Sequence, residues 1–191
     1  HLETLDGFSR ILRDWCADNL MGQASYNTSL SVGDILEFLG DKYYFYQMTP
    51  TLIVDEQWYK EVAINTRAYN ERKASLYART WHNVFHYKVT SCERDSDKNI
   101  QLRMYCRQYI DLIQESENNY TNESKKNILN VLRKIDDNLK DIDEKISLSL
   151  QEIIDFLETD NISVETIKTG FTHFKSAFGK GMQYVSLVKS I

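Results

Sequence analysis

The most regular pattern of hydrophobic and polar positions in the chain lies in residues 124–159. Apolar residues recur there at steps of three or four, which is the spacing of one face of an α-helix. The positions between them are mostly charged, as on a solvated helix face. The pattern predicts one very long central helix over residues 124–159, roughly 50 Å in length at ~1.5 Å per residue. Its apolar face consists of Ile128, Leu132, Ile135, Leu139, Ile142, Ile146, Leu150, Ile153 and Leu157.

Less regular helical patterns precede this stretch. Residues 2–22 predict a first helix, and the polar residues 23–30 predict a loop. Ser31 is suited to cap a second helix, which carries apolar residues as far as Tyr46 before Pro50 stops it. A third helix is predicted over residues 54–90, with polar positions that indicate a break near residues 69–73.

Two more helices are predicted around the central one. The fourth follows a charged turn at residues 93–99, carries Leu102 and Ile113, and ends in a loop at residues 118–122. The sixth begins after Ser163 and carries apolar residues as far as Val185. Together these patterns predict an all-α fold, in which about five to six helices form an antiparallel bundle as a single domain over residues 1–191.

The composition fits a helical globular protein and argues against one class of partner. A single proline and seven glycines in 191 residues suit long helices, and no apolar run approaches the ~18 residues of a membrane span. The net charge is −5, and residues 111–160 hold thirteen acidic against six basic side chains. Because the chain has no basic cluster, we do not expect it to bind nucleic acid.

Four N-glycosylation motifs bear on the compartment. The acceptors are Asn27, Asn119, Asn122 and Asn161, each followed two residues later by Ser or Thr. All four lie in segments that the hydrophobic pattern leaves as loops, and a glycan needs such an exposed position. Loops are rich in Asn, Ser and Thr for other reasons as well. The motifs nevertheless favour a secreted or cell-surface glycoprotein.

The three cysteines bear on the same question. Cys92 and Cys106 flank the charged turn between the third and fourth helices, where antiparallel helices would bring them together. We therefore expect a Cys92–Cys106 disulfide and a free, buried Cys16. A bridge from Cys16 to one of the other two is the first alternative. Three buried thiols in a cytosolic protein are the second, because a free cysteine packs as a small hydrophobic residue.

The sequence offers little catalytic chemistry. His82 and His86 stand four residues apart, so both imidazoles lie on one helix face, but no zinc-protease glutamate follows the first of them. Packing among Trp81, Phe85 and Tyr87 explains the pair equally well. The chain has no glycine-rich phosphate loop, no Cys-x-x-Cys and no Gly-x-Ser-x-Gly elbow. We therefore expect no enzymatic activity, no cofactor and no metal.

Aromatic residues form two further patterns. Tyr43, Tyr44 and Tyr46 surround the end of the second helix, which places at least one ring at an interface or at the rim of the core. The second pattern is a phenylalanine stripe in the C-terminal segment, flanked by Lys168 and Lys175, that suits a membrane-surface helix or the last helix of a bundle. Its members are Phe171, Phe174 and Phe178.

These observations favour a secreted or cell-surface helical protein that is not an enzyme and that binds another macromolecule, a protein partner or receptor. It would act as a ligand, a surface antigen or a salivary or venom-type effector. A membrane-active helical toxin that uses the C-terminal Phe/Lys segment is one alternative. An intracellular helical adaptor, in which the glycosylation motifs and cysteines carry no meaning, is the other.

Overall fold

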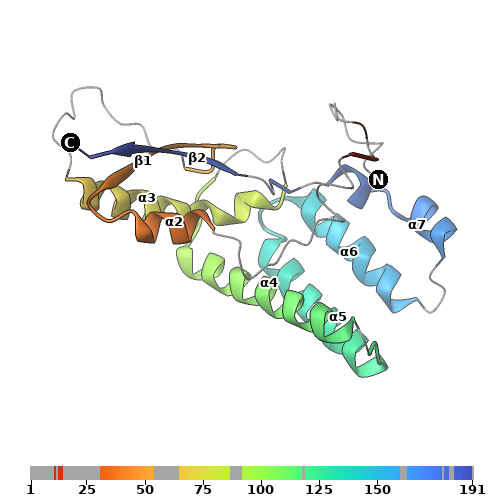
Figure 1. The fold of residues 1–191 in the computed structure, drawn as a ribbon. Helices are drawn as coiled ribbons and strands as arrows, with labels where there is room; N and C mark the ends of the chain where they lie inside the picture. The colour runs from red at the N-terminus through yellow and green to blue at the C-terminus, as the bar shows by residue number, and fades with distance from the viewer. Residues whose placement is uncertain are drawn as a thin grey trace.

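The structure of the chain is a computed structural model, and it describes residues 11, 13–14, 31–53, 65–86, 92–117, 119–159, 163–177, 179–180 and 183–190. These residues are mostly helical and include a two-stranded antiparallel sheet (Figure 1). The elements in chain order are α2 (Val32–Phe38), β1 (Tyr43–Thr49), α3 (Thr66–Thr80), the 3-10 helix η3 (Trp81–Val84), α4 (Ser96–Ser116), α5 (Asn122–Leu139), α6 (Glu144–Glu158), α7 (Val164–Gly170), the 3-10 helix η4 (Phe174–Ser176) and β2 (Tyr184–Lys189).

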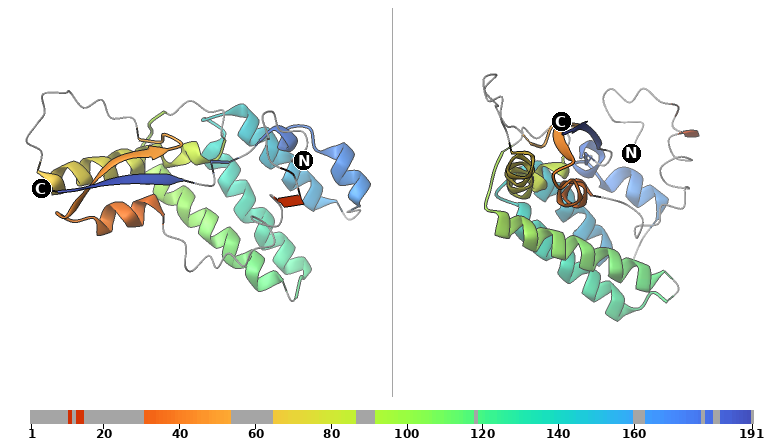
Figure 2. Two further views of the ribbon diagram at one scale, coloured as in Figure 1. Left: turned by 45° about the horizontal axis from the view of Figure 1, so that its top comes forward. Right: turned by 60° about the vertical axis from the view of Figure 1, so that its left-hand side comes forward.

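The molecule is elongated and has two regions, which Figures 1 and 2 show end to end. The sheet region consists of α2, α3, β1 and β2, and the helical region consists of α4, α5 and α6. Each region has its own apolar cluster of buried side chains. Trp81, at the end of α3, packs against the cluster of the sheet region and against one cluster of the helical region. The two regions are therefore joined through apolar packing as well as through the chain.

Helix α2 begins where the sequence predicts and ends earlier. The Ser31 hydroxyl accepts a hydrogen bond from the Asp34 N–H at 3.2 Å, and the Asp34 carboxylate accepts one from the Ser31 N–H at 2.7 Å. Leu39 ends the helix, and Gly40 follows with a φ of 54°, a left-handed conformation that suits glycine. The prediction of a helix as far as Tyr46 is wrong, because the aromatic run after Gly40 forms strand β1.

The sheet is held in place by one buried asparagine. Strand β1 pairs with β2, so that Phe45 lies opposite Leu187 and Met48 opposite Val185, with an irregularity between Phe45 and Gln47. The Asn70 side chain on α3 accepts a hydrogen bond from the Phe45 N–H at 3.0 Å. It also donates to the Tyr43 and Gly40 carbonyls at 2.8 and 3.1 Å. Asn70 thus connects α3 to the start of β1.

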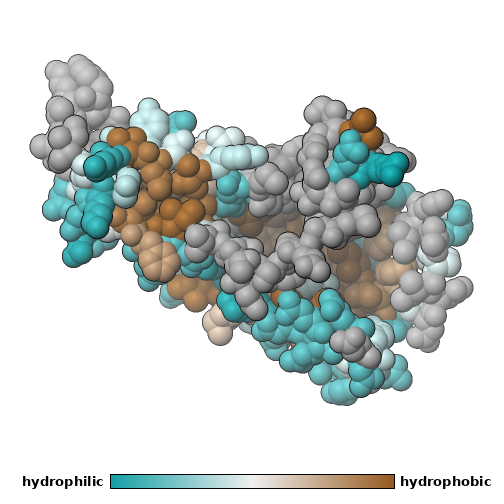
Figure 3. Space-filling view, viewed as in Figure 1, coloured by the Kyte–Doolittle hydropathy of each residue, from teal (hydrophilic) through white to brown (hydrophobic). Residues whose placement is uncertain are grey.

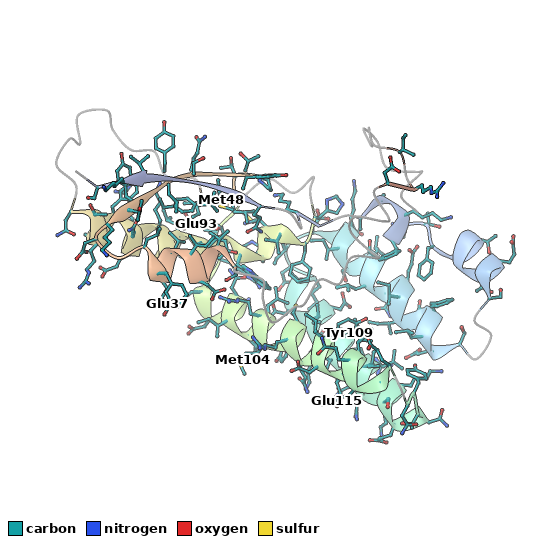
Figure 4. All side chains as sticks on the ribbon, in the orientation of Figure 1. Glu37, Met48, Glu93, Met104, Tyr109 and Glu115 are labelled. Atoms are coloured by element: carbon teal, nitrogen blue, oxygen red, sulfur yellow. The ribbon has the colours of Figure 1, made fainter. Side chains whose placement is uncertain are left out.

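The helical region is built on the apolar stripes that the sequence shows. Leu139, Ile135 and Ile128 are 0%, 4% and 2% exposed on α5, and Ile146 is 4% exposed on α6. Helix α4 runs alongside α5, which packs on α6 in turn, and Tyr109 of α4 contacts both apolar clusters between them (Figure 4). The sequence prediction that this stretch carries the buried stripe is confirmed at these four positions, whereas Ile142, also predicted to be buried, lies in the turn after α5 and is half-buried.

The prediction of one uninterrupted helix over residues 124–159 is wrong. Helix α5 ends at Leu139 and α6 begins at Glu144, with a turn between them. The turn residue Asp143 caps α6, since its carboxylate accepts a hydrogen bond from the Lys145 N–H at 2.7 Å. A four-residue interruption keeps the three-and-four spacing of apolar residues intact. Two helices folded back on one another therefore leave the same pattern as one long helix.

The remaining elements follow the prediction in part. Helix α4 is confirmed, with Asp95 as its cap. Helix α3 begins at Thr66 after its cap Asn65 and passes into η3, so no break occurs near residues 69–73. The prediction of a sixth helix is wrong beyond Gly170, where the chain forms η4 and then β2. Residues 2–10, 15–22 and 54–64 of the predicted first and third helices lie outside the described residues.

The segment after α7 is fixed to α6 by a carboxylate. Glu152 accepts hydrogen bonds from the Thr172, His173 and Phe174 N–H groups at 2.8 to 3.0 Å. Phe171 is buried and its ring lies 5.2 Å from that of Phe156, centroid to centroid. The fold is thus mostly helical, as predicted, but it includes a sheet, and the antiparallel bundle is not confirmed. In the described part of the chain, no helix is long and apolar enough to span a membrane.

Candidate functional site

The three tyrosines predicted at an interface lie on β1 and differ in exposure. Tyr46 is 57% exposed and Tyr43 is 43% exposed. Tyr44 is half-buried, and its ring packs edge-on against that of Tyr69 with the centroids 5.8 Å apart. Tyr43 and Tyr46 therefore present aromatic area to solvent, whereas Tyr44 contributes to packing on α3.

Strand β2 adds exposed side chains to the same ribbon. Tyr184, Leu187 and Val188 are all exposed, with Leu187 opposite Phe45 and Val188 opposite Tyr44, on the two faces of the ribbon. We call Tyr43, Tyr46, Tyr184, Leu187 and Val188 the sheet surface. Figure 3 shows apolar surface at this end of the molecule, where the sheet and α2 lie, with hydrophilic residues around it. Exposed apolar and aromatic side chains are typical of contact surfaces.

A charged groove lies beside the sheet region. It runs between α2 and α3, has a volume of about 520 Å³ and is reached by Arg103 from α4. Its wall carries Asp34, Glu37 and Glu71 together with Arg67 and Arg103. Because acidic and basic groups alternate in it, the groove does not select for an anion or a cation.

Two of the four predicted glycosylation sites can be placed. Asn119 is exposed in the short connection between α4 and α5, and Asn122 is exposed as the first residue of α5. The Thr121 hydroxyl caps α5 by accepting a hydrogen bond from the Ser124 N–H at 3.1 Å. Asn27 and Asn161 lie outside the described residues. The structure thus leaves Asn119 and Asn122 accessible, and their glycosylation stays a prediction.

The predicted Cys92–Cys106 disulfide is not formed, because both cysteines are free thiols. Cys92 is exposed and precedes α4, whereas Cys106 lies on α4 ten residues after its first residue and packs against the apolar cluster of Leu102. A rise of ~1.5 Å per residue places Cys106 roughly 15 Å along the helix. Burial raises the pKa of the Cys106 thiol to about 11. Cys16 lies outside the described residues.

The Cys92 thiol instead contacts a histidine. Its Sγ lies 3.3 Å from Nε2 of His82, which is 0% exposed. Burial is the main cause that lowers the pKa of His82 to about 4; the charge of Arg94 adds to the effect and the Asn99 side chain opposes it. The imidazole is therefore neutral at pH 7. Among the described residues its Nδ1 has no hydrogen-bond partner.

Asn83 fixes the backbone of Cys92. Its side chain donates to the Cys92 carbonyl at 2.8 Å and accepts from the Cys92 N–H at 3.2 Å. The same amide donates to the Thr80 carbonyl at 2.7 Å and is 0% exposed. Because η3 supplies both Asn83 and His82, the thiol is held against the imidazole by two neighbouring residues.

Two basic residues belong to the same part of the fold. Arg94 follows Cys92 by two residues and donates to Asn99 at 2.6 Å and to the Asn138 carbonyl at 2.9 Å, which fixes its guanidinium. Burial lowers the pKa of Arg94 and of Lys180. Lys180 is brought there by its backbone N–H, which donates to the Val84 carbonyl at 2.7 Å. We call Cys92, His82, Asn83, Arg94 and Lys180 the thiol cluster.

Neither histidine forms a metal site in the described residues. His82 and His86 are both buried, at 0% and 1% exposure. Within the described ranges, no group of three or more His, Cys, Asp or Glu side chains is placed to hold a metal ion. Two ligands do not complete the four that structural zinc requires. The prediction of no metal, cofactor or catalytic activity stays a prediction.

Comparison of the chain with protein-family models, with curated proteins and with solved structures finds no match. The function must therefore be argued from the sheet surface and the thiol cluster.

Sequence reasoning identified the tyrosines but missed the thiol cluster. It paired His82 with His86 and Cys92 with Cys106, because both pairs are close in sequence. The observed His82–Cys92 pair depends on the packing of the segment before α4 against η3. The hydrogen bond from the Asn83 side chain to the Cys92 carbonyl holds these two segments together. A buried asparagine carries no signal in a hydrophobic pattern. The sequence therefore held no sign of this contact.

Proposed function

We propose that the chain is an extracellular, glycosylated protein without enzymatic activity, and that it binds another protein through its sheet surface. The observation that carries this proposal is the exposure of Tyr43 and Tyr46 together with Leu187 and Val188 on a two-stranded ribbon. Tyrosine is enriched at protein interfaces because its ring supplies contact area and its hydroxyl a hydrogen bond. Burying these exposed side chains against a partner would be favourable, because apolar area would leave water.

The extracellular part of the proposal rests on the glycosylation motifs. Asn119 and Asn122 are exposed in the helical region, whereas the sheet surface lies in the other region. A glycan on either asparagine would therefore leave the sheet surface accessible. This separation supports a protein that is glycosylated on one region and binds through the other.

The C-terminal segment gives less support to the membrane-active alternative. Phe171 is 8% exposed, and its ring packs between those of Phe156 and Phe174 at 5.2 and 5.4 Å. A membrane-surface helix requires its apolar side chains on one continuous face. Here α7 ends at Gly170, and Phe171 packs toward α6.

The intracellular adaptor is the second candidate. Its support is that the fold does not pair Cys92 with Cys106, so these two described cysteines give no sign of an oxidising compartment. This candidate keeps the binding role of the sheet surface and changes only the compartment. Intact-mass and peptide analysis of protein from its natural source separates the two, because an N-glycan on Asn119 or Asn122 requires the secretory route.

Binding itself is tested with a matched pair of variants. The double variant Tyr43→Ser with Tyr46→Ser removes the aromatic area of β1. Tyr120→Ser is the control, because Tyr120 is 56% exposed, close to the 57% of Tyr46, and lies in the loop of the helical region. Labelled folded protein is titrated onto intact cells from the natural source. We expect at least a tenfold loss of affinity for the double variant and none for Tyr120→Ser, since interface tyrosines commonly contribute more than ~1 kcal/mol each. Equal binding by all three proteins would refute the proposal.

A further inference from the structure

The thiol cluster lies outside the sheet surface and serves no purpose in the proposed binding function. It joins an exposed nucleophile to a fully buried imidazole: Cys92 is exposed, and His82 is 0% exposed. A hydrophobic or a simple polar side chain would have filled the position of His82 without the cost of burying an imidazole. The arrangement therefore calls for a chemical explanation.

The orientation of His82 brings one ring nitrogen to the sulfur. Nε2 faces the Cys92 sulfur at 3.3 Å, and the Asn99 side chain also interacts with the ring. In the neutral imidazole Nε2 forms this hydrogen bond with the thiol as donor or as acceptor, according to the tautomer.

Basic residues belong to the same part of the fold. Arg94 follows Cys92 by two residues and is fixed by its hydrogen bonds to Asn99 and Asn138, and the Lys180 backbone N–H donates to the Val84 carbonyl next to Asn83. A cysteine within hydrogen-bond reach of an imidazole is the arrangement in which a thiol acts as a nucleophile. Glu93 is the neighbouring acid, and it forms an ion pair with Arg79 at 3.1 Å. That pairing reduces the effect of the Glu93 charge on the thiol.

We propose that Cys92 is a reactive thiol that forms a mixed disulfide with a low-molecular-weight disulfide of the glutathione class, with His82 as a positioning residue for its sulfur. Exposure of Cys92 gives such a disulfide access, and the hydrogen bonds of Asn83 hold the thiol in place. Cys106 is the contrasting case, because it is half-buried against the apolar cluster of Leu102.

The exchange balances without any further reactant. The Cys92 sulfur attacks one sulfur of the small disulfide R–S–S–R, forming a new S–S bond as the original S–S bond breaks. The departing RS⁻ takes up the proton that Cys92 has lost. The products are the mixed disulfide on Cys92 and one RSH, so that the protein sulfur is oxidised and the departing sulfur is reduced.

The test measures the rate at which oxidised glutathione modifies Cys92. A chain with Cys16→Ser and Cys106→Ser keeps Cys92 as its only thiol. Intact-mass spectrometry follows the adduct in folded protein and in urea-unfolded protein, with a cysteine peptide correcting for the effect of urea. We expect the folded chain to react about threefold faster or more, because only the folded chain holds the Cys92 sulfur 3.3 Å from Nε2 of His82. Equal or slower reaction in the folded chain would overturn the proposal.

Two variants test the role of the cluster. His82→Gln is expected to reduce the folded rate to that of the unfolded chain. Because His82 is fully buried and its replacement can prevent folding, Lys180→Gln gives a second test at a half-buried position. It is expected to slow the reaction about twofold, whereas Lys126→Gln, at an exposed position on α5, leaves the rate unchanged. Folded variants at both cluster positions with the parent rate would show that the cluster does not activate the thiol.

Discussion

The helical region and the sheet region differ in how their cores are built. In the helical region, α5 and α6 bury stripes of Ile and Leu that repeat every three or four residues. In the sheet region, short elements distant in sequence share one cluster, with Phe45 and Met48 of β1 packed on Val32, Leu36 and Leu76. The first core follows from a local pattern, and the second depends on contacts that the pattern does not contain.

The polar contacts differ in the same way. In the helical region, Thr121 and Asp143 cap helices through hydrogen bonds to residues two or three positions later in the chain. In the sheet region, Asn70 reaches across to β1, and at its junction with the helical region Asn83 reaches across to Cys92. In both places a buried asparagine fixes a segment that carries exposed groups, the tyrosines of β1 in one and Cys92 in the other. Function is therefore expected at the places that long-range polar contacts define.

The largest effect should come from the core of the helical region. Leu139→Ala removes a side chain that is 0% exposed, and it is expected to lower the free energy of unfolding by about 3 to 5 kcal/mol through lost transfer energy and a residual cavity. Urea unfolding followed by circular dichroism measures this. Leu148→Ala on α6 is the control, because Leu148 is 37% exposed, and its change should stay below about 1 kcal/mol. Similar losses of unfolding free energy for the two variants would show that Leu139 is not central to the core.

Asn70→Ala tests the long-range contact of the sheet region. It leaves the Phe45 N–H and the Tyr43 carbonyl without their partner, and we expect a loss of about 2 to 3 kcal/mol in unfolding free energy. The same urea titration serves, with Asn127→Ala at an exposed position on α5 as the control. A loss no larger than that of the control would show that the sheet does not depend on Asn70.

His82 should make the stability depend on pH. The pKa of His82 in the folded chain is about 4, below its ordinary 6.5, so between these values the unfolded chain binds a proton that the folded chain does not. The contribution of neutral His82 to the free energy of unfolding is therefore complete above pH 6.5 and is lost as the pH falls toward 4. The free energy of unfolding is expected to fall by about 2 kcal/mol between pH 7 and pH 5. Unfolding free energies at the two pH values measure it. A variant His82→Gln that folds should lose this part of the pH dependence, and an unchanged dependence would contradict the burial of a neutral ring.

The smallest effect concerns the carboxylate that holds the segment after α7. Burial opposes the ionised form of Glu152, but the N–H groups of Phe174, His173 and Thr172 outweigh it and lower the pKa of Glu152 below 4.5. Glu152→Gln is expected to cost about 1 kcal/mol at pH 7, and less as the pH falls through the folded-state pKa. Glu115→Gln, on the outer part of α4 (Figure 4), is the control at an exposed glutamate. Equal stability of the two variants at pH 7 would show that these hydrogen bonds contribute nothing.

The sequence predicts the helical region well because helix formation and burial are both encoded in a local spacing. Helix α4 and the buried positions Ile135, Leu139 and Ile146 follow from it directly. The turn between α5 and α6 could not be predicted from the spacing, since four interrupting residues preserve the phase of the stripe. Asp143 as a cap was the available signal, and it stands within a run of charges that also suits a solvated face.

The sheet region was harder to predict because strand pairing joins distant segments. Tyr43, Tyr44 and Tyr46 were recognised as interface candidates, but their strand requires β2, which is more than 130 residues later in the chain. The predicted sixth helix ends at Gly170 for the same reason, because the segment from Tyr184 to Lys189 pairs with β1 as strand β2. The His82–Cys92 contact needed the position of Asn83 as well.

The comparison of the two regions is tested most directly by site-specific photo-crosslinking. A photoreactive phenylalanine analogue replaces Tyr46 in the sheet region or Tyr120 in the helical region, two tyrosines of nearly equal exposure at 57% and 56%. Each protein is irradiated with intact cells from the natural source, and the products are identified by mass spectrometry. Our account predicts one partner protein crosslinked from position 46 and absent from position 120, and competed away by excess unlabelled parent protein. Crosslinking of the same partner from position 120 alone, or from both positions equally, would contradict it.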